Sequence, residues 1–184
     1  MICIPHPWHG IDPGKDVPRN INMVVEVPKD SKIKYELDKE TGLLRMDRFM
    51  YSAVLYPGDY GFVPKTLWDD DDPLDIFVLT HTPSVPMAIC EVKVIGVVRM
   101  SDKGKMDDKI LSVHAKDPRF GEWNTINDIP QHYLKELRHF LETYKELQGI
   151  KTKVYEILGQ EEAYKDIEKA LMLYKQKFDG KLFK

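Results

Sequence analysis

The acidic stretch Trp68-Asp69-Asp70-Asp71-Asp72-Pro73-Leu74-Asp75 runs directly into the apolar segment Ile76-Phe77-Val78-Leu79. Four consecutive aspartates repel one another and suit neither a helix nor a strand. The proline that follows them removes a backbone donor and keeps the residue before it extended. We therefore predict a loop that enters a short buried strand. In extended geometry Asp70 and Asp72 would point to the same side, with Asp75 at the entrance of the strand.

The sequence on both sides of this stretch is rich in strand patterns. Short apolar or alternating runs, separated by Pro, Gly and Asp, predict strands at residues 21–27, 34–38, 43–47, 76–79, 88–100 and 109–114. Residues 38–42 form a plausible hairpin turn between two of these strands. Gly96 lies inside the longest run, where a glycine often marks a bulge or the corner of a barrel.

The last third of the chain is predicted to be helical. Asn127 or Asp128 could cap a first helix, with Pro130 in its first turn and apolar residues at three- and four-residue spacing as far as Leu147. A second helix is predicted at residues 160–178. Many strands followed by helices favour an α+β fold, here a small closed, OB-like β-barrel flanked by two main helices. With no linker or repeat, residues 1–184 are expected to form a single domain.

Composition excludes several classes of protein. The chain has 27 basic and 30 acidic residues, a balance that indicates no nucleic-acid partner. The two cysteines, Cys3 and Cys90, lack the spacing of a zinc site and do not suggest a disulfide framework, which favours a reducing, cytoplasmic location. The absence of a long apolar run or a signal-peptide pattern predicts no membrane association.

The concentrated negative charge of the loop has two interpretations. A run of aspartates can simply be solvated, but Trp68 before it and the apolar strand after it tie this run to a core. Clustered carboxylates bind hard cations such as Mg²⁺ or Mn²⁺. An EF-hand would need a different residue at Leu74 and glycine in place of Asp75. A haloacid-dehalogenase type phosphatase would place its aspartates after a buried strand rather than before one.

Cationic and phenolic side chains that could bind phosphate are distributed over other predicted elements. Each one taken alone also fits an ordinary surface or core position. The cationic and phenolic side chains are Lys34, Arg48, Tyr56, Tyr60, Lys109, Tyr144 and Lys145. The acidic residues Glu36, Asp102 and Asp107 are further candidates for the site.

Taken together, these segments resemble family I soluble inorganic pyrophosphatase, of the prokaryotic type. Residues 70–76 match the signature D-x-D-P-x-D followed by an aliphatic residue. Four further motifs match in the same order: residues 33–36, 47–50, 56–61 and 144–145. The resemblance extends from about Pro13 to Leu147, and five ordered motifs make a chance match improbable.

The resemblance implies hydrolysis of pyrophosphate to two phosphates by metal-activated water, with Asp72 as the general base. It implies several Mg²⁺ ions per subunit, with Mn²⁺ or Zn²⁺ as possible substitutes. The metal ligands would be Asp70, Asp75, Asp102, Asp107, Glu26 and Glu36. The phosphates would contact Lys34, Arg48, Tyr60, Lys109, Tyr144 and Lys145, and Tyr56 would support the site. Asp69, Asp71, His132 and His139 receive no role.

Physical chemistry supports this assignment. Pyrophosphate is a compact polyanion that repels a nucleophile, so its hydrolysis needs carboxylates for metals and cations for phosphate close together. The resemblance also implies a homo-oligomer, and the short chain favours a hexamer. Two alternatives stay open: a metal-dependent hydrolase of organic phosphates or nucleotides, and an OB-type module that binds nucleic acid. An acidic face and a pI near 6.1 disfavour the second alternative.

Overall fold

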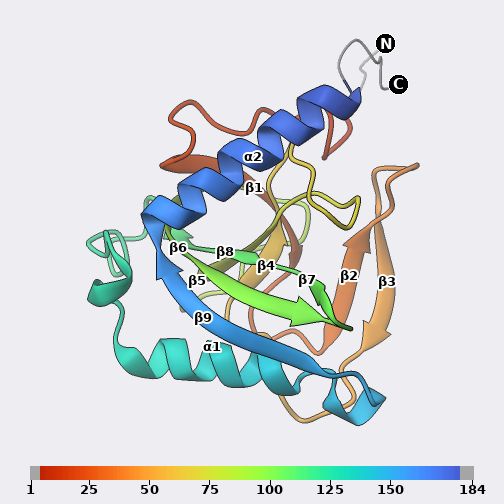
Figure 1. The fold of residues 1–184 in the computed structure, drawn as a ribbon, viewed down its shortest axis with the longest axis vertical. Coiled ribbons are helices and arrows are strands. Elements are labelled where there is room, and N and C mark those ends of the chain that lie inside the picture. The colour runs from red at the N-terminus through yellow and green to blue at the C-terminus, as the bar shows by residue number, and fades with distance from the viewer. Residues whose placement is uncertain (1–4, 179–184) are drawn as a thin grey trace.

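A five-stranded barrel forms the centre of the structure, a computed structural model that describes residues 5–178 (Figure 1). Its strands are β1 (Asn20–Val27), β4 (Asp59–Phe62), β5 (Asp75–Leu79), β8 (Lys109–His114) and β6 (Ile89–Asp102). They pair in that order, and β6 closes the barrel by pairing with β1. Only β5 and β8 run parallel; the other pairs of the barrel are antiparallel. The predicted α+β class and closed barrel are confirmed.

The long strand β6 belongs to two parts of the sheet. Its first half pairs with β1, and its second half leaves the barrel to pair with β9 (Thr152–Gly159) and the two-residue strand β7 (Lys105–Met106). The register with β8 shifts between Val94 and Gly96, which confirms the predicted bulge. A side chain at Gly96 would place its Cβ 2.4 Å from the Leu158 carbonyl oxygen, so glycine allows β9 to approach.

Two helices cover opposite sides of the barrel (Figure 1). Helix α2 (Gln160–Phe178) has the predicted bounds, but α1 (Gln131–Thr143) differs from the prediction at both ends. Pro130 itself occupies the N-cap position. Asp128 instead belongs to the 3₁₀ turn η1 (Ile126–Asp128), where its carboxylate accepts hydrogen bonds from the backbone N–H groups of residues 124 and 125. After Thr143 the chain forms a second turn, η2 (Glu146–Gln148), and Leu147 is exposed.

Two large apolar clusters fill the space between the barrel and the helices. One lies under α1 and includes Phe77, Leu137 and Phe140. The other lies under α2 and joins Ile167 of the helix to Trp68, directly before the acidic run. Burial of Trp68 confirms that the acidic loop is anchored to the core.

A two-stranded hairpin of β2 (Ile33–Leu37) and β3 (Leu44–Phe49) stands beside the barrel (Figure 1). The register pairs Lys34 with Arg48, so both side chains lie on the same face of the hairpin. Within residues 5–178, the helices are too short or too polar to cross a membrane. Cys90 carries a free thiol, and Cys3 lies outside the described residues.

Candidate active site

The barrel, the hairpin and the end of α1 enclose one cavity of about 410 Å³. Every side chain that the sequence assigned to a site contributes to its lining, although these residues come from segments far apart in the chain. They are Glu26, Lys34, Glu36, Arg48, Tyr56, Tyr60, Asp70, Asp72, Asp75, Asp102, Asp107, Lys109, Tyr144 and Lys145.

The acidic loop is a tight turn rather than an extended segment, and the predicted geometry was wrong in this respect. The Trp68 N–H donates to the Asp72 carbonyl at 2.7 Å, and the Asp71 N–H donates to the Trp68 carbonyl at 3.1 Å. Asp71 has a positive φ of 69°, which reverses the chain. The turn nevertheless directs Asp70 and Asp72 to the cavity, while Asp69 and Asp71 form ion pairs with α2 on the outside.

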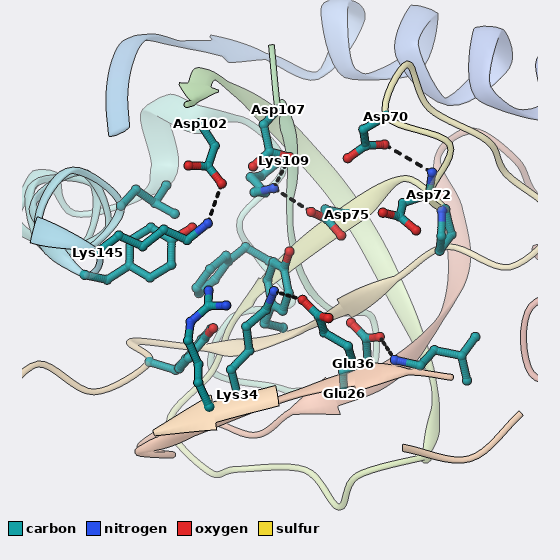
Figure 2. A pocket seen from close by; sticks show the side chains of 18 of the residues that line it. Glu26, Lys34, Glu36, Asp70, Asp72, Asp75, Asp102, Asp107, Lys109 and Lys145 are labelled. Carbon is teal, nitrogen blue, oxygen red and sulfur yellow. Dashed lines mark hydrogen bonds and ion pairs between the residues drawn. The ribbon is translucent and has the colours of Figure 1, made fainter. Parts of the chain in front are cut away.

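Carboxylates and cations alternate around the cavity (Figure 2). Asp70, Asp72 and Asp75 project from one side, and Lys34 and Lys145 from the other. Between them the Lys109 ammonium group contacts Asp75 and Asp107, each at 2.5 Å, and its side chain is only 3% exposed. Lys145 pairs with Asp102, and Lys34 pairs with Glu36. The structure thus places cations within contact distance of the predicted metal ligands.

The carboxylates on the acidic side destabilise one another's charged form. Burial, and then the neighbouring charge of Asp75, raise the pKa of Glu26 to about 8, although its Oε1 accepts a 2.7 Å hydrogen bond from the Leu37 N–H. Burial, followed by repulsion from Asp75 and Asp72, also raises the pKa of Asp70. Burial raises the pKa of Asp75 itself in spite of Lys109. A further positive charge in this part of the cavity would stabilise all three carboxylates.

The pKa values of the phenols are raised as well, but here the consequence is a neutral hydrogen-bond donor. Burial raises the pKa of Tyr56, Tyr60 and Tyr144 above the usual value, so these hydroxyl groups stay protonated at neutral pH. A protonated phenol can donate a hydrogen bond to a phosphate oxygen without adding negative charge.

The donor groups of the site determine whether it suits a metal ion. Among the described residues, no three histidine, cysteine or carboxylate groups lie close enough together to hold a metal ion as they stand. Lys109 and Lys145 instead pair with the carboxylates. One oxygen of Asp102 is buried without a hydrogen-bond partner within residues 5–178. Carboxylate oxygens with raised pKa values and an unpaired buried oxygen fit a hard divalent cation.

The sequence did not indicate the part that Lys39 plays in the site. This residue lies in the hairpin turn, where a lysine usually has no special role, yet its ammonium group pairs with the Asp72 carboxylate. The same group donates to the Asp71 carbonyl at 3.1 Å. These contacts form only when the hairpin folds over the loop, so no pattern in the local sequence indicates them.

Comparisons with known proteins give a consistent result. The family model described as inorganic pyrophosphatase matches residues 23–175. Soluble inorganic pyrophosphatase 2 of Chlamydomonas reinhardtii is 47% identical over 173 residues, which are 94% of this chain and 90% of that protein. The soluble inorganic pyrophosphatase of Zea mays is 44% identical over 171 residues, 93% of this chain and 80% of that protein.

Solved structures show the same likeness. The inorganic pyrophosphatase from Thermus thermophilus superposes with a TM-score of 0.89 at 37% identity, covering 92% of this chain and 99% of that one. The enzyme from Helicobacter pylori gives a TM-score of 0.85 at 38% identity, with coverage of 90% and 98%.

Proposed function

Because this chain belongs to the inorganic pyrophosphatase family and hydrolyses inorganic pyrophosphate to two phosphates, we propose that the cavity is the site of hydrolysis and that Asp72 is the general base. One observation carries the proposal: carboxylates and cations from distant segments line a single small cavity (Figure 2). A compact polyanion that must be attacked by water needs both kinds of group within reach.

The cationic side would bind the two phosphate groups. Lysine ammonium groups and an arginine guanidinium offer charge-assisted hydrogen bonds, and the protonated phenols offer further donors. The residues concerned are Lys34, Arg48, Tyr60, Lys109, Tyr144 and Lys145, with Tyr56 packed against Tyr60 at a ring-centroid separation of 5.8 Å.

The carboxylates of the cavity would hold Mg²⁺, with several ions per subunit and Mn²⁺ or Zn²⁺ as possible substitutes. The ligands would be Asp70, Asp75, Asp102 and Asp107, assisted by Glu26 and Glu36. When bound, such ions lower the pKa of the attacking water and stabilise the charge of the phosphates. The chain's own carboxylates would position these ions, and its lysines would turn from carboxylates to phosphate when the substrate enters.

Asp72 is suited to accept the proton because it faces the cavity from a loop whose turn is fixed. Its backbone carbonyl accepts the Trp68 N–H at 2.7 Å, and its backbone N–H donates to Asp70 Oδ1 at 3.2 Å. Its side chain is 47% exposed, so water can reach it. A positioned carboxylate of this kind can take the proton that water loses as it attacks phosphorus.

The cavity favours pyrophosphate over a nucleotide. The aromatic residues that line it, Tyr56, Tyr60, Tyr144, Phe77 and Phe140, are each at most 7% exposed. Among the described lining residues, therefore, no open ring face is available on which a nucleobase could stack. We therefore prefer hydrolysis of pyrophosphate to the alternative, hydrolysis of nucleotides.

Replacing Asp72 with Asn tests the role of the base. Because the amide cannot accept the proton, kcat for pyrophosphate should fall by about 100-fold or more. Mg²⁺ binding, measured by calorimetry, should remain. Asp30→Asn is a matched control, since Asp30 makes an exposed ion pair with Lys29 away from the cavity. Normal turnover in the Asp72 variant would remove its base role, and loss of Mg²⁺ binding would make it a ligand instead.

We also propose that residues 1–184 act as a single domain that assembles into a homo-oligomer, a hexamer, in the cytoplasm. Large apolar side chains are exposed on β3 and directly after it, at Met46, Phe49 and Tyr51, and self-association would cover them. Sedimentation velocity over a range of protein concentrations should give the mass of a hexamer. A monomer at high concentration would contradict this assembly.

A further inference from the structure

The outer face of the acidic loop is paired with helix α2, an element that carries none of the sequence motifs. Lys169 Nζ lies 3.2 Å from Asp69 Oδ2, and Lys177 Nζ lies 2.6 Å from Asp71 Oδ1. The two lysines are eight positions apart, a little over two helical turns, so they project from similar sides of α2. The two aspartates without a role in the site are therefore the two that contact this helix.

Backbone and aromatic contacts reinforce the same connection. The Leu67 N–H donates a 3.0 Å hydrogen bond to the carbonyl oxygen of Ala170 in α2. The Lys169 ammonium group also lies 4.3 Å from the ring centre of Trp68, whose side chain is buried under the helix. The loop is thus fixed to α2 at its beginning, and the ion pairs extend this attachment along its length.

The loop needs such support because of its charge and its geometry. Like charges on neighbouring aspartates push the turn apart, and Asp71 holds a positive φ that non-glycine residues rarely adopt. Cations on the outer side offset this repulsion. In a tight turn, rotation of the outer side chains toward the cavity would carry the inner ones away from it.

We propose that Lys169 and Lys177 are positioning residues of the active site: by pairing with Asp69 and Asp71 outside the loop, they keep Asp70 and Asp72 directed into the cavity. This proposal rests on the proposed function, because the orientation of Asp70 and Asp72 affects turnover only if they act in hydrolysis. Exposed ion pairs contribute little to global stability, so the effect should appear in the loop and in turnover rather than in unfolding.

The test is the double variant Lys169→Ala/Lys177→Ala, compared with Lys165→Ala as a matched control. Lys165 lies on the same helix and pairs only with Glu162 among the ion pairs of the described residues. Hydrogen exchange followed by mass spectrometry should show peptides covering residues 67–72 exchanging about fivefold faster in the double variant, as expected for the loss of two exposed pairs. The kcat should fall by a similar factor, about fivefold, with a smaller change in KM.

A second variant separates charge from helix structure. Lys169→Arg/Lys177→Arg keeps both cations and should restore slow exchange and kcat, whereas failure to restore them contradicts a role for charge. Faster exchange in β1 as well as in the loop would indicate general unfolding and would overturn the proposal. So would loop exchange and kcat equal to those of the Lys165 control. If loop exchange responds while Asp72→Asn leaves turnover unchanged, it is the base assignment that fails, and the positioning of the loop stands.

Discussion

At the scale of single residues, Gly96 and Gly159 form an informative pair. They are register partners where β6 leaves the barrel and meets the end of β9. An added Cβ at Gly96 would lie 2.4 Å from the Leu158 carbonyl oxygen, closer than packing allows, whereas an added Cβ at Gly159 would meet nothing within 4 Å. Two neighbouring glycines therefore face different constraints.

Gly96→Ala should destabilise the protein because backbone, rather than a movable side chain, stands in the way. We expect the free energy of unfolding to fall by about 1–3 kcal/mol, the usual effect of overpacking. Gly159→Ala should change it by less than about 0.5 kcal/mol. Urea unfolding of both variants gives the comparison. Equal stabilities would show that β6 and β9 are free to separate at this point.

Individual side chains of the site could be predicted from sequence where motifs fix residue type and order. Contacts made across long chain separations could not. Asp59 is not among the site residues predicted from the sequence, yet it is fully buried and accepts hydrogen bonds from the N–H groups of Lys29 and Ser84. Although burial works against its charge, these bonds and the contact with His114 hold the pKa of Asp59 below its usual range. No local pattern distinguishes such a carboxylate from a solvated turn residue.

At the scale of elements, strong periodicity predicted the bounds of α2 and most strands, and weak periodicity failed. Strand β4 has only four residues and begins with the buried Asp59, while β9 mixes charged and apolar residues. Neither segment has the clear apolar or alternating run that predicts a strand. The apolar spacing continued past the true end of α1, but Tyr144 caps the helix, Lys145 follows it, and both line the cavity. Two of the proposed phosphate-binding residues thus coincide with the place where the helix prediction was wrong.

The acidic loop illustrates the same point. Its sequence indicated negative charge and a connection to the core, and both are present. The orientation of its aspartates depends on a turn with positive φ at Asp71 and on lysines from α2 about a hundred residues later in the chain. Propensity arguments report on neighbours in sequence, so they cannot locate these partners.

At the scale of the whole molecule, the closed barrel explains how a chain of small net charge builds a highly charged site. The carboxylates come from the acidic loop, the start of β5, the end of β6 and the turn before β8, and also from β1 and the hairpin. The cations come from the hairpin, the start of β8 and the end of α1. Closure of β1 on β6 and the packing of α1 on β9 bring these segments together. Acidic and basic residues are interleaved along the sequence because the same elements supply both kinds of side chain to the cavity.

We propose that this cavity hydrolyses pyrophosphate selectively and depends on divalent metal. The most direct measurement is phosphate release from pyrophosphate and from ATP, each with Mg²⁺, after chelation with EDTA, and after Mg²⁺ is restored. We expect phosphate release from pyrophosphate to be many times faster than from ATP, to be abolished by EDTA and to recover with Mg²⁺. Comparable rates on ATP, or undiminished turnover after chelation, would contradict it.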